Sequence, residues 1–370
     1  MRVAFYAPLK PADHPTPSGD RLMARLLVKA MAMAGHDVQI ASQLRTYAAE
    51  PDEALYRALK SEAQREAARL NASWSHASAA WIPDCWFTYH PYYKSPDWIG
   101  PEVSTRFGIP YVTAEASYAP KRDRDGWRIW QDDVVAGLRQ ASASFCYTTI
   151  DHEGLQRLEL PGKLVDLPPF IDPPPQVTRA RRSTAAPRIA TIGMMRRGNK
   201  LDSYLMLAEA LKLLLGVPWR LAVMGDGPAR ADVLAAFSAI PPDRIDWLGQ
   251  VDDATVAAEL SACDLYVWPG VDEAYGVSYL EAQAMGLPVV AQDTAGVPAV
   301  VENGTGGWLT PAGDLQAFVS AIHNLLTDSD MRAGMGSAAA QFVREKRGVP
   351  EAAARIGAVL AGLPVQERRA

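Results

Sequence analysis

The chain has 370 residues, of which 48% are hydrophobic, and its formal net charge at pH 7 is −5. This length accommodates two domains of ordinary size. The acidic balance argues against a nucleic-acid partner, and no apolar run approaches the roughly 20 residues that span a bilayer, so we expect a soluble two-domain protein.

The first half of the chain alternates short apolar runs with helical patterns. The predicted strands are Val3–Ala7, Val38–Ala41, Trp86–Tyr89, Tyr111–Ala114 and Ser144–Tyr147, and the clearest helices are Asp20–Ala34 and Asp52–Arg69. Such alternation predicts a doubly wound parallel sheet, because a crossover between parallel strands usually contains a helix.

The N-terminus and the cysteines both favour a cytoplasmic location. The first seven residues enter a strand directly and lack the apolar core and cleavage site of a signal peptide. The three cysteines are Cys85, Cys146 and Cys263, an odd number without metal-like spacing. We therefore predict buried free thiols in a reducing compartment.

A proline-rich polar stretch separates the first half from a second set of strands. Residues 171–187 lack periodicity and are interpreted as a linker. The predicted strands after it are Ile189–Gly193, Leu221–Met224, Ile245–Leu248, Leu265–Trp268 and Val289–Ala291. We therefore expect an α/β protein with one domain over residues 1–170, a second over residues 188–345, and a helical tail over residues 346–370.

Two glutamates flank the turn between the fourth and fifth of these later strands. Pro269 and Gly270 end the fourth strand, and helical spacing begins at Gly276. Glu273 therefore lies in the loop, while Glu281 falls on the second turn of the helix. The unpaired amides at the start of such a helix can hold a diphosphate, with Glu273 reaching a sugar and Glu281 a ribose. The alternative is that Glu273 only complements the helix dipole and Glu281 is a solvated acid.

The segment from Glu273 to Ala291 resembles the Glu-x7-Glu signature of retaining GT-B glycosyltransferases, in particular glycosyltransferase family four. Further matches follow in family order at Gly225-Asp-Gly-Pro228, Trp247-Leu-Gly249 and Asp293-Thr-Ala-Gly-Val-Pro298. The resemblance implies two Rossmann-like domains facing across a cleft, with the tail packing back on the first. It also implies metal-independent transfer of a hexosyl unit from a nucleoside diphosphate sugar to an acceptor hydroxyl, with retention of configuration.

The same resemblance implies a set of site residues. The catalytic candidates are Glu273, Arg196, Lys200 and Glu115. The donor-binding candidates are Gly19, Gly225, Gly249, Gln250, Tyr275, Gly276, Val277, Ser278 and Glu281. The candidate on the acceptor side is His90. Positive charge from an arginine and Lys200 would neutralise the leaving diphosphate. Spacing favours Arg196 over Arg197. Glu115 stands where the family commonly has a histidine.

The resemblance implies no metal ion and no organic cofactor, and the donor would be a UDP-, GDP- or ADP-sugar. The acceptor would be a glycan, a glycolipid or a small molecule, and oligomeric state and peripheral membrane association stay open. Two alternatives remain: an inactive relative that only binds a nucleotide sugar, and a nucleotide-sugar 2-epimerase of the same fold. The Asp123-Arg-Asp125 stretch lies in a polar loop, which disfavours a metal-dependent transferase.

Overall fold

The computed structural model describes residues 1–16, 18–76, 80–174 and 186–364. The chain divides into two compact units. The first comprises Met1–Pro168 and Val349–Ala370, and the second comprises Pro169–Gly348. Each unit is built on a six-stranded sheet in which every strand pair is parallel. The predicted α/β class with two doubly wound sheets is confirmed.

The sheet of the first unit has the order β2-β1-β3-β4-β5-β6. Its strands are β1 (Arg2–Tyr6), β2 (Asp37–Ile40), β3 (Cys85–Tyr89), β4 (Tyr111–Ala114), β5 (Ala141–Cys146) and β6 (Lys163–Asp166). The sequence prediction missed β6. This edge strand is only four residues long and has exposed charged residues at both ends, so it shows no apolar run.

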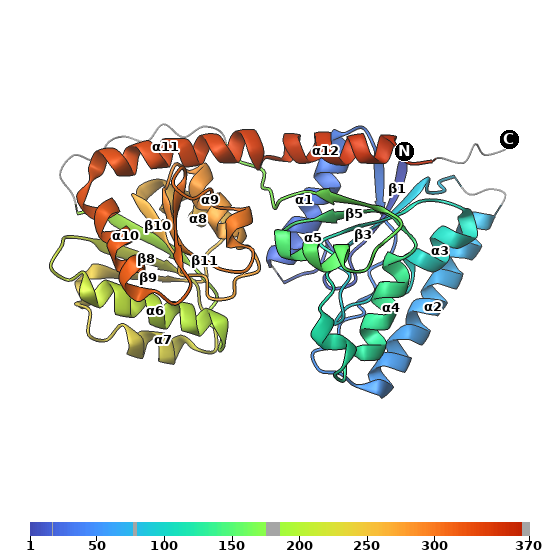
Figure 1. Ribbon diagram of the computed structural model, residues 1–370, viewed down its shortest axis with the longest axis horizontal. Coiled ribbons are helices and arrows are strands. Elements are labelled where there is room, and N and C mark those ends of the chain that lie inside the picture. Colours follow the sequence, from blue (N-terminus) through green and yellow to red (C-terminus); the bar gives the residue numbers. More distant parts are fainter. Residues whose placement is uncertain (17, 77–79, 175–185, 365–370) are drawn as a thin grey trace. The chain divides into compact units, whose positions relative to one another are not determined.

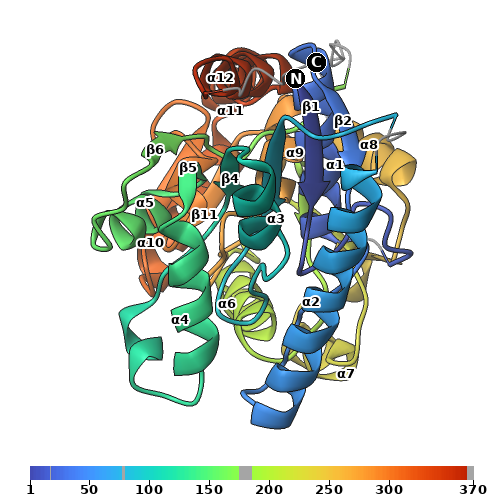
Figure 2. The same cartoon turned by 90° about the vertical axis from the view of Figure 1, so that its right-hand side faces the viewer.

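Helices cover both faces of the first sheet. They are α1 (Gly19–Met33), α2 (Glu53–Ser75), α3 (Gly100–Phe107), η1 (Pro120–Asp123), α4 (Arg128–Leu138), α5 (Thr149–Gln156) and α12 (Val349–Ala361). Helices α1 and α12 pack together, whereas α2, α3 and α4 lie beside one another on the other face (Figure 2). The C-terminal helix α12 thus completes the first unit although it follows the second in sequence.

The sheet of the second unit has the order β12-β11-β10-β7-β8-β9. Its strands are β7 (Arg188–Ile192), β8 (Arg220–Met224), β9 (Ile245–Gly249), β10 (Leu265–Val267), β11 (Val289–Asp293) and β12 (Gly307–Pro311). Strand β12 was also missed by the sequence prediction. It is an edge strand as well, it starts with glycine and ends with proline, and these residues are depleted in strands.

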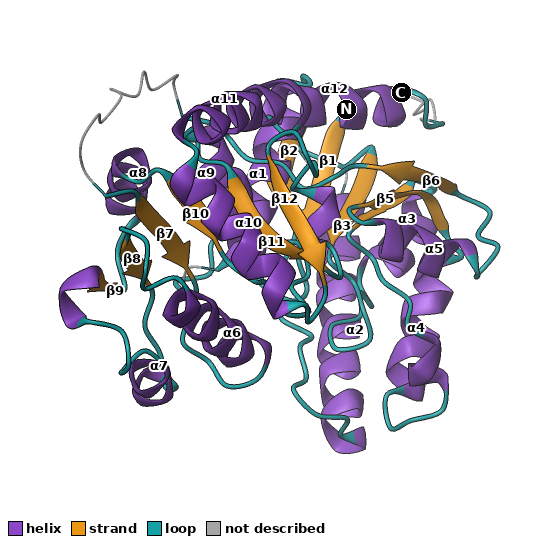
Figure 3. Ribbon diagram, turned by 60° about the vertical axis from the view of Figure 1, so that its left-hand side comes forward, coloured by secondary structure: helices purple, strands orange, loops and turns teal. Residues whose placement is uncertain are grey.

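The helices of the second unit sandwich its sheet. They are α6 (Asn199–Leu213), α7 (Arg230–Ala236), η2 (Pro242–Arg244), α8 (Asp253–Ala262), α9 (Val277–Ala284), η3 (Val297–Ala299), α10 (Leu315–Thr327) and α11 (Ser329–Lys346). Helices α6 and α7 lie on one side of the sheet and α8, α9 and α11 on the other (Figures 1 and 3). Each helix of the described ranges is too short or too polar to cross a membrane.

The two segments through which the chain passes from one unit to the other lie side by side. Ile171 is 4% exposed, pairs with Gly348 in an isolated parallel bridge, and donates its N–H to the carbonyl of Arg347 at 2.9 Å. The predicted linker over residues 171–187 therefore begins as ordered chain. Most of that linker, residues 175–185, lies outside the described residues, as do residues 365–370 of the predicted tail.

Candidate active site

The loop between β10 and α9 contains two glycines with left-handed backbone. Gly270 has φ 68° and Gly276 has φ 75°, which is left-handed backbone that side chains other than glycine rarely adopt. A Cβ at Gly276 would meet the Tyr279 ring at 2.7 Å, and the Tyr279 hydroxyl donates to the Trp268 carbonyl at 3.1 Å. The loop is therefore tied to the end of β10, which places Glu273 beside the strand end.

Glu273 meets Lys200 across two loops of the second unit. The Lys200 ammonium, on the first turn of α6, lies 2.5 Å from Glu273 Oε2. The indole N–H of Trp268 donates to the same oxygen at 3.2 Å. The Glu273 side chain is 14% exposed and that of Lys200 is 31% exposed. A carboxylate and an ammonium thus lie together at the carboxyl edge of the sheet.

A cavity of about 420 Å³ opens at this pair. Its lining comes from the loop before α6, the first turn of α6 and the loop after β10, and consists of Arg196, Arg197, Gly198, Asn199, Lys200, Val271, Asp272 and Glu273. Both arginines are exposed, and the Arg196 guanidinium donates to Met194 Sδ at 2.8 Å. The structure therefore brings Arg196, Lys200 and Glu273 together, and it places Arg197 on the same cavity.

The predicted glycines of the neighbouring loops allow backbone to approach backbone. Gly225 has φ 153°, donates its N–H to the Gly249 carbonyl at 2.8 Å, and would press a Cβ against the Gly193 carbonyl. Gly249 itself has φ 68°, and Gln250 after it is exposed. These glycines hold the loops after β7, β8 and β9 against each other, so Gly225 has a structural role, and its predicted role in donor binding stays a prediction.

The first turn of α9 offers unpaired amides. Gly276 caps the helix without a side-chain hydrogen bond, and the amides that follow it, at Val277 and Ser278, have no partner within the helix. The Ser278 hydroxyl accepts a hydrogen bond from the buried Tyr266 hydroxyl at 2.9 Å. Tyr275, before the cap, is 7% exposed. The predicted anion site therefore rests on backbone groups held by buried tyrosines.

Glu281 lies half-buried on the second turn of α9. Burial, together with the charge of Asp253, raises the pKa of its carboxyl to about 7. No side chain or backbone group of the described ranges forms a hydrogen bond with this carboxyl, so its acceptor capacity is available to a ligand. A half-buried carboxyl whose pKa is raised by burial differs from the fully solvated surface acid of the alternative interpretation.

In the first unit, two predicted residues occupy equivalent strand ends. His90 directly follows β3 and Glu115 directly follows β4, with φ 59° and 54° respectively. The His90 Nδ1 atom lies 3.7 Å from Glu115 Oε1 and 3.2 Å from Asp20 Oδ1 at the start of α1. Left-handed backbone at such residues costs roughly 1–3 kcal/mol each, and this kind of strain concentrates at functional sites.

The charges of this cluster are strongly coupled. Burial raises the pKa of Glu115, the nearby His90 lowers it, and the carboxylates of Asp20 and Asp151 raise it, with the result at about 7. Burial also opposes a charged His90, but Glu115, Asp20 and Asp151 outweigh it and raise the pKa of the imidazole to about 9. The sequence analysis missed Asp20 and Asp151. Their position in the first turn of a helix after a strand was the available signal.

Gly19 begins α1, and Ser18 caps that helix by accepting the Arg21 N–H at 3.2 Å. A Cβ added at Gly19 would meet no atom within 4 Å. The protein alone therefore does not require glycine there, and the predicted close approach of a ligand stays a prediction.

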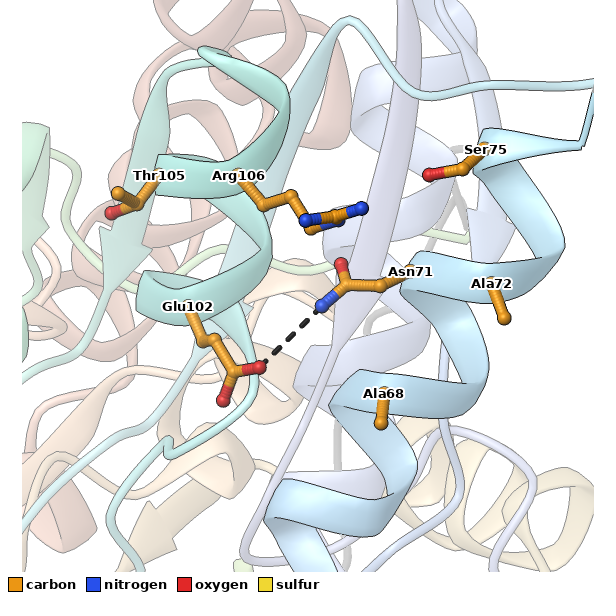
Figure 4. A pocket seen from close by; sticks show the side chains of 7 residues that line it. All are labelled: Ala68, Asn71, Ala72, Ser75, Glu102, Thr105 and Arg106. Carbon is orange, nitrogen blue, oxygen red and sulfur yellow. Dashed lines mark hydrogen bonds between the residues drawn. The ribbon is translucent and has the colours of Figure 1, made fainter.

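A larger cavity of about 760 Å³ lies between α2 and α3 (Figure 4). Its lining is Ala68, Asn71, Ala72, Ser75, Glu102, Thr105 and Arg106. The Asn71 amide donates to Glu102 at 3.4 Å across it. Helices α2 and α3 lead into the amino ends of β3 and β4, so this cavity lies away from the carboxyl edge where the predicted residues gather.

Comparison with solved structures defines the fold as GT-B. Sucrose-phosphate synthase from Thermosynechococcus elongatus superposes with a TM-score of 0.74 at 19% identity, over 98% of this chain and 98% of that chain. HepE from Anabaena, solved in complex with UDP-glucose, gives a TM-score of 0.67 at 17% identity, over 98% of this chain and 100% of that chain.

The sequence places the second unit in a family. Residues 186–328 match the family model "Glycosyl transferases group 1", so this chain carries a domain of that family, as the motif resemblance predicted. Phosphatidyl-myo-inositol mannosyltransferase of Mycobacterium leprae is 40% identical over 103 residues, which is 28% of this chain and 28% of that enzyme. The alignment thus spans little more than a quarter of the length of this curated relative.

Proposed function

We propose that the protein is a retaining, metal-independent glycosyltransferase that moves a sugar from a nucleoside diphosphate sugar to an acceptor hydroxyl. The observation that carries the proposal is the Glu273 carboxylate held beside Lys200 on a cavity at the carboxyl edge of the second sheet. Sites in open parallel sheets form at this edge. In support, the first amides of α9 have no partner within the helix, and no group of the described residues forms a hydrogen bond with the Glu281 carboxyl, so these groups are available to a diphosphate and a ribose.

In this proposal each group of the second unit has one task. The amides at Val277 and Ser278 bind the diphosphate, and Arg196 and Lys200 neutralise the charge that develops as the bond from sugar to phosphate breaks. Glu273 contacts the donor sugar. The acceptor oxygen bonds to the anomeric carbon on the face that the phosphate leaves, and the departing phosphate oxygen takes the acceptor proton. His90 and Glu115 keep the roles that the resemblance implies.

A uridine diphosphate sugar is the first donor to test, because HepE was solved with UDP-glucose. A cytoplasmic location is part of the proposal, since Cys85, Cys146 and Cys263 are all buried and none of them forms a disulfide bond within the described residues. The acceptor class stays a glycan, a glycolipid or a small molecule.

The test begins with binding. UDP-, GDP- and ADP-sugars are screened by thermal shift, because a ligand that binds only the folded protein raises its melting temperature. The donor that binds is then assayed for transfer and for slow hydrolysis, with and without EDTA, and the anomeric configuration of the product is read by NMR. We expect turnover that EDTA does not abolish, and a product that retains the donor configuration. An inverted product, or full loss with EDTA, contradicts the mechanism.

One observation favours a second candidate, a nucleotide-sugar-binding protein without transfer. Glu115 occupies the place where the resemblance expects a histidine, and it is 7% exposed beside His90. Tight binding of a donor with neither transfer nor hydrolysis across an acceptor panel is the outcome that selects this function.

A further inference from the structure

Trp268, which directly follows β10, is fixed on every side. It is 1% exposed, and its ring meets the Tyr204 ring edge-on at 4.9 Å. Its backbone N–H donates to the Val290 carbonyl, and its backbone carbonyl accepts a hydrogen bond from the Tyr279 hydroxyl, each at 3.1 Å. A Cβ at Gly193 would lie 2.9 Å from the indole Cη2. Close packing therefore holds the indole in this orientation.

That orientation brings Trp268 against both charged groups of the candidate site. Its indole N–H donates to Glu273 Oε2 at 3.2 Å, and the Lys200 ammonium contacts the same oxygen. The Lys200 ammonium lies 5.5 Å from the indole ring centroid. The other oxygen, Oε1 of Glu273, forms no hydrogen bond with any group in the described part of the chain.

The two donors on Oε2 differ in what a bound diphosphate would do to them. Lys200 is a point charge on a flexible stem, so a diphosphate competes with Glu273 for it. The indole N–H is less readily drawn away, because it is a neutral donor on a closely packed ring. Once Lys200 turns to the phosphates, Trp268 is the donor that remains on the carboxylate.

We propose that Trp268 is a positioning residue that holds Glu273 through Oε2, so that Oε1 is presented to the donor sugar while Lys200 is engaged by the diphosphate. This inference rests on the proposed function. The Trp268 indole N–H then keeps the Glu273 carboxylate in place, because reacting groups must be held in position to within a fraction of an ångström.

The central test is Trp268→Phe, which keeps a buried aromatic ring and removes the N–H. We expect kcat for transfer to fall about tenfold and the donor KM to change less than twofold, because the lost hydrogen bond orients a group that acts in the transition state. The matched control is Trp219→Phe in the same unit. Trp219 is also 1% exposed, and its N–H donates to the Leu214 carbonyl at 2.8 Å. We expect both variants to lose a similar amount of thermal stability, and only Trp268→Phe to lose kcat.

A double-mutant cycle shows whether the effect passes through the carboxylate. In a Glu273→Gln background, Trp268→Phe should lower kcat by less than twofold, since there is no carboxylate to position. If Trp268→Phe does not fold, Gly193→Ala displaces the same ring without removing it, and should lower kcat with the donor KM unchanged.

Unchanged kcat in the soluble variant, an equal loss in Trp219→Phe, or a full tenfold loss in the Glu273→Gln background overturns the inference. Those results leave the proposed function standing, because they require an active wild-type protein. A wild-type protein that transfers no sugar from any donor contradicts the proposed function itself.

Discussion

The two sheets share an architecture but carry opposite charge at their carboxyl edges. In the second unit, Arg196, Arg197 and Lys200 line one cavity with Asp272 and Glu273, so basic residues outnumber acidic ones there. In the first unit, three carboxylates lie near the single imidazole of His90. A diphosphate is stabilised by the basic edge and repelled by the acidic one. We therefore expect the two edges of this shared architecture to differ in the ligands that they bind, because their side chains differ.

The edges also differ in which residues take left-handed backbone. In the second unit these are mostly glycines, including Gly270 and Gly276, for which the conformation has no steric cost. In the first unit they are His90 and Glu115, the two candidate site residues. The first unit therefore has left-handed backbone at two candidate site residues themselves, whereas the second unit has it mostly at glycines and also at Asp272, directly before Glu273.

Removal of the Glu273 carboxylate from the second unit should have the largest effect on activity. Glu273→Gln keeps the size of the side chain but removes its charge, so we expect kcat to fall about 100- to 1,000-fold, as for other preorganised electrostatic groups. Nucleotide affinity should stay within about twofold, because the diphosphate and ribose contacts are separate. Steady-state kinetics and calorimetry with the nucleoside diphosphate measure the two quantities. A parallel loss of nucleotide affinity would remove the division of tasks between Glu273 and Glu281.

Removal of Lys200, the partner of Glu273, should have the second largest effect on activity. We expect Lys200→Ala to lower kcat/KM about 30- to 100-fold without unfolding the protein, because the leaving diphosphate loses a neutralising charge. Lys212→Ala on the same helix is the matched control. Its ammonium lies 2.7 Å from Glu209 and its side chain is 28% exposed, against 31% for Lys200. Normal turnover in Lys200→Ala would take this lysine out of the site.

Loss of the Glu281 carboxyl should affect binding rather than chemistry. We expect Glu281→Ala to weaken nucleoside diphosphate binding about tenfold at pH 8, with kcat at saturating donor nearly unchanged. Because the pKa of Glu281 is raised to about 7, the wild-type affinity should rise as the pH increases through 7 and the carboxylate forms. Isothermal titration from pH 6 to pH 8 measures this rise. A wild-type affinity that is flat with pH contradicts the assignment to ribose.

The cluster of His90 and Glu115 in the first unit should make stability depend on pH, and this is the smallest of the expected effects. The pKa of His90 is raised from 6.5 to about 9, so its contribution to stability is complete below pH 6.5 and lost towards pH 9. The pKa of Glu115 is raised from 4.5 to about 7 by burial, so the folded state binds more protons there and loses stability from pH 4.5 to 7. Both groups make the melting temperature fall with rising pH.

His90→Gln should flatten this profile by a few degrees between pH 6.5 and 9, as measured by calorimetry. The exposed His323→Gln is the control and should keep the wild-type slope. A His90→Gln profile as steep as that of the wild type would show that the coupled cluster does not form in solution.

Much of the fold could be predicted from the sequence, because apolar runs and glycine or proline boundaries are local signals. The ends of the predicted strands lie within three residues of the ends of the observed strands, and the helix before Gly286 was placed correctly. The two strands that were missed, β6 and β12, lie at sheet edges where one side has no neighbouring strand. Edge strands need fewer apolar residues, so their pattern is weak.

The sequence by itself determined the alternation of strands and helices, the turn that carries Glu273, and the place of Glu281 on the following helix. Only the tertiary structure decided which side chains meet. Lys200 and Glu273 are 73 residues apart, and His90 and Asp20 are 70 apart. Such pairs form because parallel strands bring their carboxyl ends to one edge, whichever segments of the chain they come from. A periodic pattern records which face of an element is buried, but it does not record that Trp268 and Lys200 share one oxygen of Glu273, because that depends on packing to within a fraction of an ångström.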